Sequence, residues 1–336
     1  MQTDKDKTRA VVLGAGSWGT ALAQLLASNG HNVTLWMRDA AQAEAINANR
    51  QNARYLPDAP LHAGITATAN LPDFGKADLC LSVIPAQHTR DQLTHFSGHI
   101  PKNLPIVLCS KGIEISTLDF MNEVLADTVP QAARFVLSGP SFARDVVKGL
   151  PTAVTLAGDD LDAANALAPL IRGATFRPYT TDDMIGAEVG GAVKNVLAIA
   201  CGMLLGMGLG QSAHAALIAR GFAEMNRLGA ALGARAETLS GLCGLGDLVL
   251  TCSSTQSRNM SCGMAVGKGE SLAEIMAARN SVTEGVATAP ALAQMAAREG
   301  VDMPISLAVN RVLRGEIQPA EAMADLLARP LKKEAG

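Results

Sequence analysis

The 336-residue sequence is poor in aromatic and in charged side chains. Aromatic residues make up 3% of it and charged residues 18%, whereas hydrophobic residues make up 48%. So much apolar material with so little charge is typical of a compact protein and argues against a disordered one. The formal net charge of -3 excludes long-range attraction to nucleic acid or to an anionic membrane. Any phosphate that the protein binds must therefore be held by a few well-placed residues.

The sequence also lacks the patterns of metal sites, export signals and membrane spans. Its six cysteines form no C-x-x-C pair and its six histidines no His-x-x-His pair, so we expect reduced cysteines and no metal. Residues 1–9 are polar and contain no apolar signal region, which predicts a cytoplasmic protein. The uncharged stretch 195–219 is long enough to cross a bilayer, but four glycines interrupt it. We interpret it as a buried pair of helices and expect no membrane span.

The order of apolar patterns predicts two domains. Short runs rich in β-branched residues alternate with amphipathic segments in the first half, as in βαβ units. The predicted strands are Arg9–Leu13, Asn32–Trp36, Asp78–Ile84, Ile106–Cys109, Arg134–Leu137 and Thr152–Ala157. After about Tyr179 helical patterns take over, as in 215–232 and 289–298. We therefore predict an α/β fold: an N-terminal Rossmann-like, doubly wound, mostly parallel sheet over residues 1–188, followed by an all-α C-terminal domain over 189–336.

The first predicted strand runs directly into a G-x-G-x-x-G motif and then a helical segment. In this motif Gly14 permits a tight turn, Gly16 lets the backbone approach a pyrophosphate, and Gly19 packs helix on strand. The helix N-terminus offers unpaired N–H groups to the same anion. A second strand ends about 20 residues later, as this context requires. The motif predicts a bound dinucleotide.

The residues after the second strand bear on which dinucleotide is bound. Arg38 comes first and Asp39 second. An arginine there pairs with the 2′-phosphate of NADP, whereas an acidic residue accepts from the ribose of NAD. The pair could equally be a surface ion pair or a helix cap. We expect NADP(H) to be preferred and NAD(H) to remain possible.

Several short polar segments, each surrounded by apolar residues, resemble those of a known family. They are Ser110-Lys111-Gly112, the segment 138–143, Val193-Lys194-Asn195, the segment 244–248, Ser257-Arg258-Asn259 and the segment 282–285. Together with the glycine motif they resemble the bacterial-type NAD(P)-dependent glycerol-3-phosphate dehydrogenases, from the first strand to about residue 315. The resemblance implies reduction of dihydroxyacetone phosphate to sn-glycerol 3-phosphate, which supplies phospholipid synthesis. It also implies a homodimer.

Hydride transfer to a ketone requires a nearby acid, and lysine is a suitable one when its pKa is lowered. A buried lysine close to another lysine meets that condition, whereas a nearby aspartate opposes it. The resemblance implies that Lys194, which we expect to open an apolar helix, is the proton donor and acceptor. It implies further that Lys111 helps to bind substrate and cofactor, and that Asn195 and Asp247 orient these groups. The alternative is that both lysines form ordinary surface ion pairs.

A substrate phosphate needs an arginine and further donors, which Ser257, Arg258 and Asn259 can provide. Alternatively, Ser257 caps a helix and Arg258 is solvated. Gly139 and Ser141 are further candidate substrate contacts. The remaining cofactor candidates are Ser17, Trp18, Trp36, Tyr55, Ala143, Val282 and Glu284, with Lys111 and Arg258 reaching both molecules.

Two other functions remain possible from sequence. One is a reductase of another small keto or hydroxy acid, such as 2-ketopantoate or 6-phosphogluconate. The other is a dinucleotide sensor without catalysis, which needs neither a lysine acid nor an arginine for phosphate.

Overall fold

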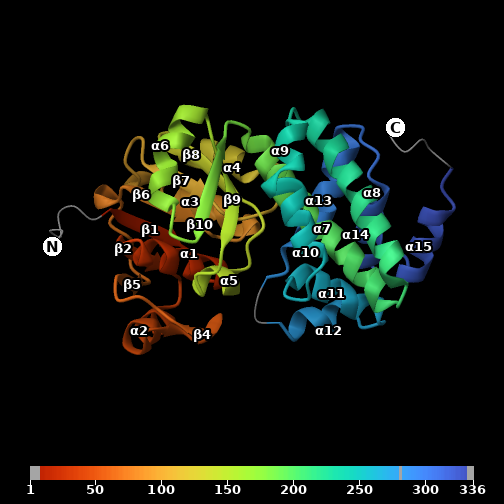
Figure 1. Cartoon of the computed structure of the whole chain (residues 1–336), viewed down its shortest axis with the longest axis horizontal. Helices are drawn as coiled ribbons and strands as arrows, with labels where there is room; N and C mark the ends of the chain where they lie inside the picture. Colours follow the sequence, from red (N-terminus) through yellow and green to blue (C-terminus); the bar gives the residue numbers. More distant parts are fainter. Residues whose placement is uncertain (1–7, 280–281, 331–336) are drawn as a thin grey trace.

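A parallel-rich sheet and a bundle of helices lie side by side and make up the molecule (Figure 1). The computed structural model describes residues 8–279 and 282–330. The sheet has the strand order β10-β9-β8-β7-β6-β1-β2-β5. Its strands are β1 (Arg9–Leu13), β2 (Asn32–Trp36), β5 (Ile65–Thr68), β6 (Leu79–Ser82), β7 (Pro105–Leu108), β8 (Ala133–Ser138), β9 (Thr152–Gly158) and β10 (Phe176–Thr181). The predicted Rossmann-like sheet followed by an all-helical domain is confirmed.

All six predicted strands are present, with bounds that differ by at most two residues, but the sheet has features that the patterns did not indicate. Strand β9 pairs with β8 in antiparallel orientation. The edge strands β5 and β10 were missed because their residues are partly exposed and lack a continuous apolar run. A small antiparallel hairpin, β3 (Gln51–Asn52) and β4 (Leu56–Pro60), was missed too.

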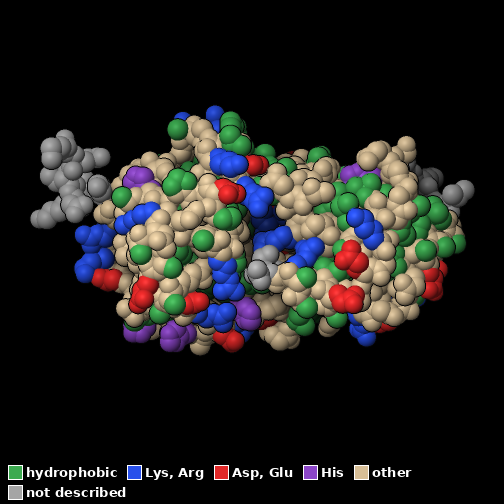
Figure 2. All heavy atoms as spheres, turned by 90° about the horizontal axis from the view of Figure 1, so that it is seen from below, with side chains coloured by type: hydrophobic (Ala, Val, Ile, Leu, Met, Phe, Trp, Pro, Cys, Tyr) green, Lys and Arg blue, Asp and Glu red, His purple; other side chains and the backbone are tan. Residues whose placement is uncertain are grey.

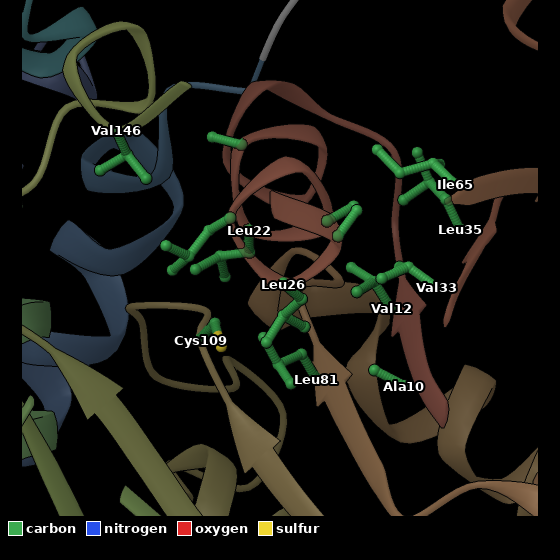
Figure 3. Close-up of a cluster of buried hydrophobic side chains, with 14 of the residues drawn as sticks. Ala10, Val12, Leu22, Leu26, Val33, Leu35, Ile65, Leu81, Cys109 and Val146 are labelled. Carbon is green, nitrogen blue, oxygen red and sulfur yellow. The ribbon is translucent and has the colours of Figure 1, made fainter. Parts of the chain in front are cut away.

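Side chains that alternate along β1 fill a separate core on each face of the sheet. Ala10 and Val12 point into one core, Val11 and Leu13 into the other. Figure 3 shows Val12 in the first core, on the side of the sheet where Leu22 and Leu26 of α1 also lie. Helices α1 (Ser17–Ser28), α2 (Ala40–Asn49), α5 (Ala143–Val147) and α6 (Leu161–Ile171) cover that face, and α3 (Ala86–Phe96) and α4 (Met121–Thr128) cover the other.

The second half is built around one long apolar helix, α7 (Met184–Gly206). Its most apolar window is 89% buried inside the protein, so α7 is a core helix, as predicted for the first part of the uncharged stretch. Helix α8 follows after a short break, but most of its residues up to 219 are exposed or half-buried, so the predicted burial of both helices is wrong for the second one. The predicted domain boundary after residue 188 falls within α7 and stays a prediction. The remaining helices are α8 (Gly210–Ala231), α9 (Ala236–Ser240), α10 (Asp247–Cys252), α11 (Arg258–Gly267), α12 (Leu272–Ala277), α13 (Glu284–Arg298), α14 (Pro304–Leu313) and α15 (Pro319–Leu327).

Glycines bring α7 and α11 into backbone contact. A β-carbon at Gly202 would overlap the carbonyl oxygen of Met260, and one at Gly263 would overlap that of Ile199. Such close approach requires residues without a side chain. The helix that carries Arg258 is therefore held at a fixed position on the helix that carries Lys194.

Candidate active site

The glycine motif has the backbone that a dinucleotide pyrophosphate needs. Gly14 has a φ of 107°, and a β-carbon there would lie 2.8 Å from the carbonyl oxygen of Val83. A β-carbon at Gly19 would overlap the carbonyl oxygen of Gly14, whereas one at Gly16 would meet only open space. The first turn of α1 carries no acidic residue and no side-chain cap, so its N–H groups are available to an anion. These residues fit a dinucleotide.

The β3–β4 hairpin is attached to this motif. Asn52 Nδ2 donates to the carbonyl oxygen of Ala15 at 2.9 Å, and Ser17 Oγ donates to that of Tyr55 at 3.2 Å. The buried Nε1 of Trp18 has no hydrogen-bond partner among the described residues. Tyr55 of the hairpin thus lies beside Ser17 of the motif, which sequence spacing alone did not show.

The end of β2 separates the roles of Arg38 and Asp39. Asp39 Oδ1 accepts from the backbone N–H of Gln42 at 3.1 Å and so caps α2. Arg38 is exposed, and within residues 8–279 and 282–330 it forms no ion pair. Trp36 does not line an adenine site in this structure, because its ring is buried edge-on against Phe96 at 5.0 Å.

Two lysines share one buried aspartate where the two halves meet. Lys194 Nζ lies 2.6 Å from Asp247 Oδ1 and 2.9 Å from Thr251 Oγ1. Lys111 Nζ lies 2.6 Å from Asp247 Oδ2 and donates to the carbonyl oxygen of Gly139 at 3.1 Å. Lys194 is 6% exposed and Asp247 is 1% exposed. These two lysines therefore form no ordinary surface ion pairs.

The charges of this cluster set its pKa values. Burial lowers the pKa of Lys194 to about 8, the Asp247 charge opposes that change, and Lys111 adds to it. Burial alone would raise the pKa of the Asp247 carboxyl, but the two ammonium groups hold it below its usual value. Lys194 can consequently exchange a proton near neutral pH while Asp247 stays ionised.

Lys194 does not open its helix, contrary to the sequence prediction, but lies in the middle of α7. It is brought to Asp247 because a π-helical turn, Leu242–Gly246, packs closely on α7: a β-carbon at Gly190 would overlap the carbonyl oxygen of Cys243. Such turns are frequent at functional sites. Sequence analysis missed Thr251, although its spacing of four residues from Asp247 on α10 places both side chains on one helix face.

A chain of amides connects Lys111 to the helical half. Asn195 Nδ2 donates to the carbonyl oxygen of Lys111 at 3.3 Å, and Asn259 Nδ2 donates to Asn195 Oδ1 at 2.8 Å. Asn259 Oδ1 in turn accepts from the backbone N–H of Gly285 at 2.9 Å. Asn195 and Asn259 thereby join the loop after β7 to the first turns of α11 and α13.

The turn after β8 contributes backbone groups beside Lys111. Gly139 has a φ of 144°, and a β-carbon there would lie 2.9 Å from Val154 Cα. Ser141 Oγ donates to the carbonyl oxygen of Gly139 at 3.0 Å, and Ala143 begins α5, which packs against α1. Gly139 and Ser141 therefore lie at the lysine cluster and Ala143 on the side of the glycine motif.

A cluster of buried polar side chains lies around Lys111 and includes a residue that sequence analysis missed. It includes Ser110, Ser138 and Glu188. Ser110 Oγ, Ser138 Oγ and Glu188 Oε2 are buried and have no hydrogen-bond partner among the described residues. Glu188 Oε1 accepts from the backbone N–H of Asn122 at 2.9 Å. Burial raises the pKa of Glu188 to about 8. This carboxyl group is therefore largely neutral at pH 7.

Lys and Arg side chains gather where the two halves of the molecule meet, as Figure 2 shows. Arg258 is exposed at the start of α11, and Ser257 Oγ caps that helix by accepting from the N–H of Met260 at 3.2 Å. Surrounding protein atoms lower the pKa of Arg258, an effect that Glu284 opposes.

The start of α13 and the residues just before it include two more predicted residues. Val282 is 46% exposed. Burial raises the pKa of Glu284. The charge of Arg258 and the backbone N–H groups of Lys111 and Ala86 lower this pKa and so oppose the effect of burial. Glu284 thus lies close both to the phosphate candidate Arg258 and to the backbone of Lys111 in the loop after β7.

The structure describes all six cysteines as buried and free. Within residues 8–279 and 282–330, no group of three or more His, Cys, Asp or Glu residues could hold a metal ion.

Comparison with known proteins connects this arrangement to one family. The models of the N-terminal and C-terminal parts of NAD-dependent glycerol-3-phosphate dehydrogenase match residues 9–164 and 183–324. NAD(P)+ glycerol-3-phosphate dehydrogenases of Hyphomonas neptunium and Maricaulis maris are each 58% identical to this chain, over 96% of it and over 96% and 97% of their own lengths. The crystal structure of glycerol-3-phosphate dehydrogenase from Coxiella burnetii superposes with a TM-score of 0.92, at 38% identity, over 96% of this chain and 99% of that one.

Proposed function

The chain belongs to the NAD-dependent glycerol-3-phosphate dehydrogenase family, and we propose on that premise how its own residues reduce dihydroxyacetone phosphate to sn-glycerol 3-phosphate. The resemblance predicted from sequence is confirmed. The protein is an NAD(P)-dependent oxidoreductase. The observation that carries the proposed mechanism is the pair of lysines on one buried aspartate, Lys194 and Lys111 on Asp247.

Lys194 donates the proton in the proposed reduction. A bound reduced nicotinamide would supply the hydride that the carbonyl carbon accepts. The carbonyl oxygen then needs a proton, and the Lys194 ammonium can give one because burial lowers its pKa to about 8. Asp247 keeps the side chain in place and stabilises the charged form. In the reverse reaction the neutral amine of Lys194 accepts the proton from the alcohol.

Lys111 binds rather than protonates in this proposal. Its ammonium is held by Asp247, which Lys194 also contacts, and by the carbonyl oxygen of Gly139. Its positive charge favours the developing oxyanion and keeps the pKa of Lys194 low. Asn195 fixes the backbone of Lys111.

Arg258 binds the substrate phosphate, with Asn259 beside it. Support comes from the exposed guanidinium at the start of α11, which is held against α7 by glycine contacts. Ser257 acts as the helix cap and contributes through the orientation of that first turn. We assign Val282 and Glu284 to the cofactor; the charge of Arg258 is close enough to oppose the raised pKa of Glu284.

For the cofactor we propose a preference for NADP(H), with NAD(H) also used. Because Asp39 caps α2, its carboxylate is already engaged, and Arg38 is left exposed at the end of β2. A free guanidinium at this position suits a 2′-phosphate. The glycine motif with its hairpin holds the rest of the dinucleotide through Gly14, Gly16 and Gly19.

The test is to assay the purified protein with several candidate substrates, each in combination with NADPH or NADH. Dihydroxyacetone phosphate should be reduced with NADPH and, less efficiently, with NADH, and mass spectrometry should identify sn-glycerol 3-phosphate. 2-Ketopantoate should not be reduced and 6-phosphogluconate should not be oxidised. Turnover of either rival with no reaction of dihydroxyacetone phosphate would refute the proposed function, and cofactor binding without turnover of any substrate would favour a sensor.

A homodimer and a cytoplasmic location complete the proposal, together with a role in supplying glycerol phosphate to phospholipid synthesis. Apolar side chains exposed on the helical half, such as Leu209 and Leu307, are available to a second copy. Light scattering after size-exclusion chromatography would test the dimer.

A further inference from the structure

Arg279 lies just beyond α12 and connects the start of α11 to the residue before α13. Its Nη1 donates to the carbonyl oxygen of Arg258 at 2.7 Å, and its Nη2 donates to Ser261 Oγ at 3.1 Å. Nη1 also lies 3.4 Å from Thr283 Oγ1. Arg258 and Ser261 belong to the first turn of α11, and Thr283 directly precedes α13. One guanidinium therefore ties the proposed phosphate site to the segment that carries Glu284.

All three of these acceptors are neutral, so the charge of Arg279 is not cancelled by its own contacts. Within the described parts of the chain, neither Arg258 nor Arg279 forms an ion pair shorter than 4 Å. The two positive charges are close enough that Arg279 adds to the lowering of the Arg258 pKa.

The charge of Glu284 opposes the lowering of the Arg258 pKa, and burial raises the pKa of Glu284 itself. Arg258 and Arg279 thus place two positive charges around the first turn of α11, neither of them in an ion pair within the described residues. A doubly charged phosphate would relieve this repulsion on binding.

We propose that Arg279 is a positioning residue of the phosphate site: it fixes the turn that carries Arg258 and adds a second positive charge beside it. This inference rests on the proposed function for the identity of the substrate, though not for the presence of an anion site. Arg279 follows Arg258 by 21 residues, so the polar segment around Arg258 did not indicate it. Arg279 acts on the substrate only by way of Arg258. Replacing Arg279 should therefore weaken binding of the phosphate and hardly change the rate of the chemical step.

Four variants test this role. Arg279→Gln removes the charge, and Arg279→Lys keeps the charge but removes the two-pronged contact with α11. Arg258→Gln is the reference for loss of the anchor itself. Arg298→Gln is the matched control, since Arg298 is an exposed arginine on α13 that pairs with Glu299.

For each variant we would measure kcat and KM with dihydroxyacetone phosphate, and the Kd of inorganic phosphate by titration calorimetry without cofactor or substrate. Arg279→Gln should raise KM and the phosphate Kd about tenfold, with kcat changed by less than about threefold. Arg279→Lys should show a smaller rise in both. Arg298→Gln should match the wild type, and NADPH affinity should be unchanged in Arg298→Gln and in both Arg279 variants.

The two readouts separate failure of this inference from failure of the proposed function. A wild type that binds phosphate but does not reduce dihydroxyacetone phosphate would overturn the function and leave the anion site intact. Equal phosphate affinity in Arg279→Gln and the wild type would overturn the role of Arg279. So would a loss of kcat and NADPH affinity at unchanged phosphate affinity, which indicates a purely structural role.

If Arg279→Gln does not fold, Ser261→Ala removes one acceptor of Arg279, together with the hydrogen bond that Ser261 Oγ donates to the carbonyl oxygen of Arg258. It should raise the phosphate Kd about twofold to threefold. No change in Kd would then count against the inference.

Discussion

Replacing Lys194 by arginine separates its proton from its charge. Burial lowers the pKa of Lys194 to about 8, although Asp247 lies 2.6 Å away. At this pKa about nine-tenths of the molecules carry the proton at pH 7 and about one-tenth at pH 9. Because reduction uses the ammonium form, kcat should fall about tenfold over that interval. Oxidation of glycerol 3-phosphate uses the amine and should accelerate about tenfold over the same interval.

Arginine keeps the positive charge beside Asp247 but does not release a proton near neutral pH. Lys194→Arg should therefore lose on the order of 10²- to 10⁴-fold in kcat, as should Lys194→Ala, because general acid–base groups contribute about that much. The decline between pH 7 and pH 9 should disappear in both variants. NADPH binding should survive, since the glycine motif belongs to the other half of the molecule.

The assay is steady-state turnover in both directions across this pH range, with fluorescence titration of NADPH as a check on folding. Lys268→Arg is the matched control, because Lys268 is exposed at the end of α11. Near-native turnover of Lys194→Arg would refute the reasoning: only the charge would then matter, and the proton would have to come from Lys111 or from a bound water.

Three further changes test other parts of the site. Arg38→Ser should weaken NADPH far more than NADH, because only NADPH has the 2′-phosphate, and equal losses in the two Kd values would contradict the NADP preference. Arg258→Ala should raise KM for dihydroxyacetone phosphate about tenfold or more while hardly affecting unphosphorylated dihydroxyacetone; similar losses on both substrates would mean a structural role. Glu188 has its pKa raised to about 8 in the folded protein, so its stabilising contribution is complete below its ordinary value of 4.5 and is lost as pH rises to about 8. The melting temperature of the wild type should accordingly fall relative to Glu188→Gln between those pH values, and parallel curves would show that Glu188 does not titrate there.

Much of the cofactor half could be predicted from sequence because its signals are local. The turn at Gly14, the open approach at Gly16 and the helix contact at Gly19 lie within six consecutive residues that follow a strand. The strands of the sheet interior are apolar on nearly every residue, since helices cover both faces. The edge strand β10 lacks that burial on both sides, and its pattern was accordingly not recognised. The antiparallel direction of β9 depends on its pairing with β8, and no sequence pattern in either strand indicates that direction.

The lysine cluster shows what sequence by itself could determine about the site. The resemblance named Lys111, Lys194 and Asp247, but the contacts that join them span 136 and 53 residues of chain. Which neighbours shift the pKa of Lys194, and in which direction, depends on distances of a few ångströms across two domains. Burial and Asp247 act in opposite senses, so the outcome could not be decided before both positions were known.

Sequence by itself determined the order of the elements, the dinucleotide motif and the kinds of side chain present, because these follow from local periodicity and from residue type. Only the tertiary structure decided that Asp39 is engaged as a helix cap while Arg38 stays exposed, and that Arg279 holds the turn of Arg258. Hydrogen bonds between segments distant in sequence, and the burial of their side chains, exist only once the chain has packed. These contacts and this burial set the charge state and the available partners of an arginine or a glutamate.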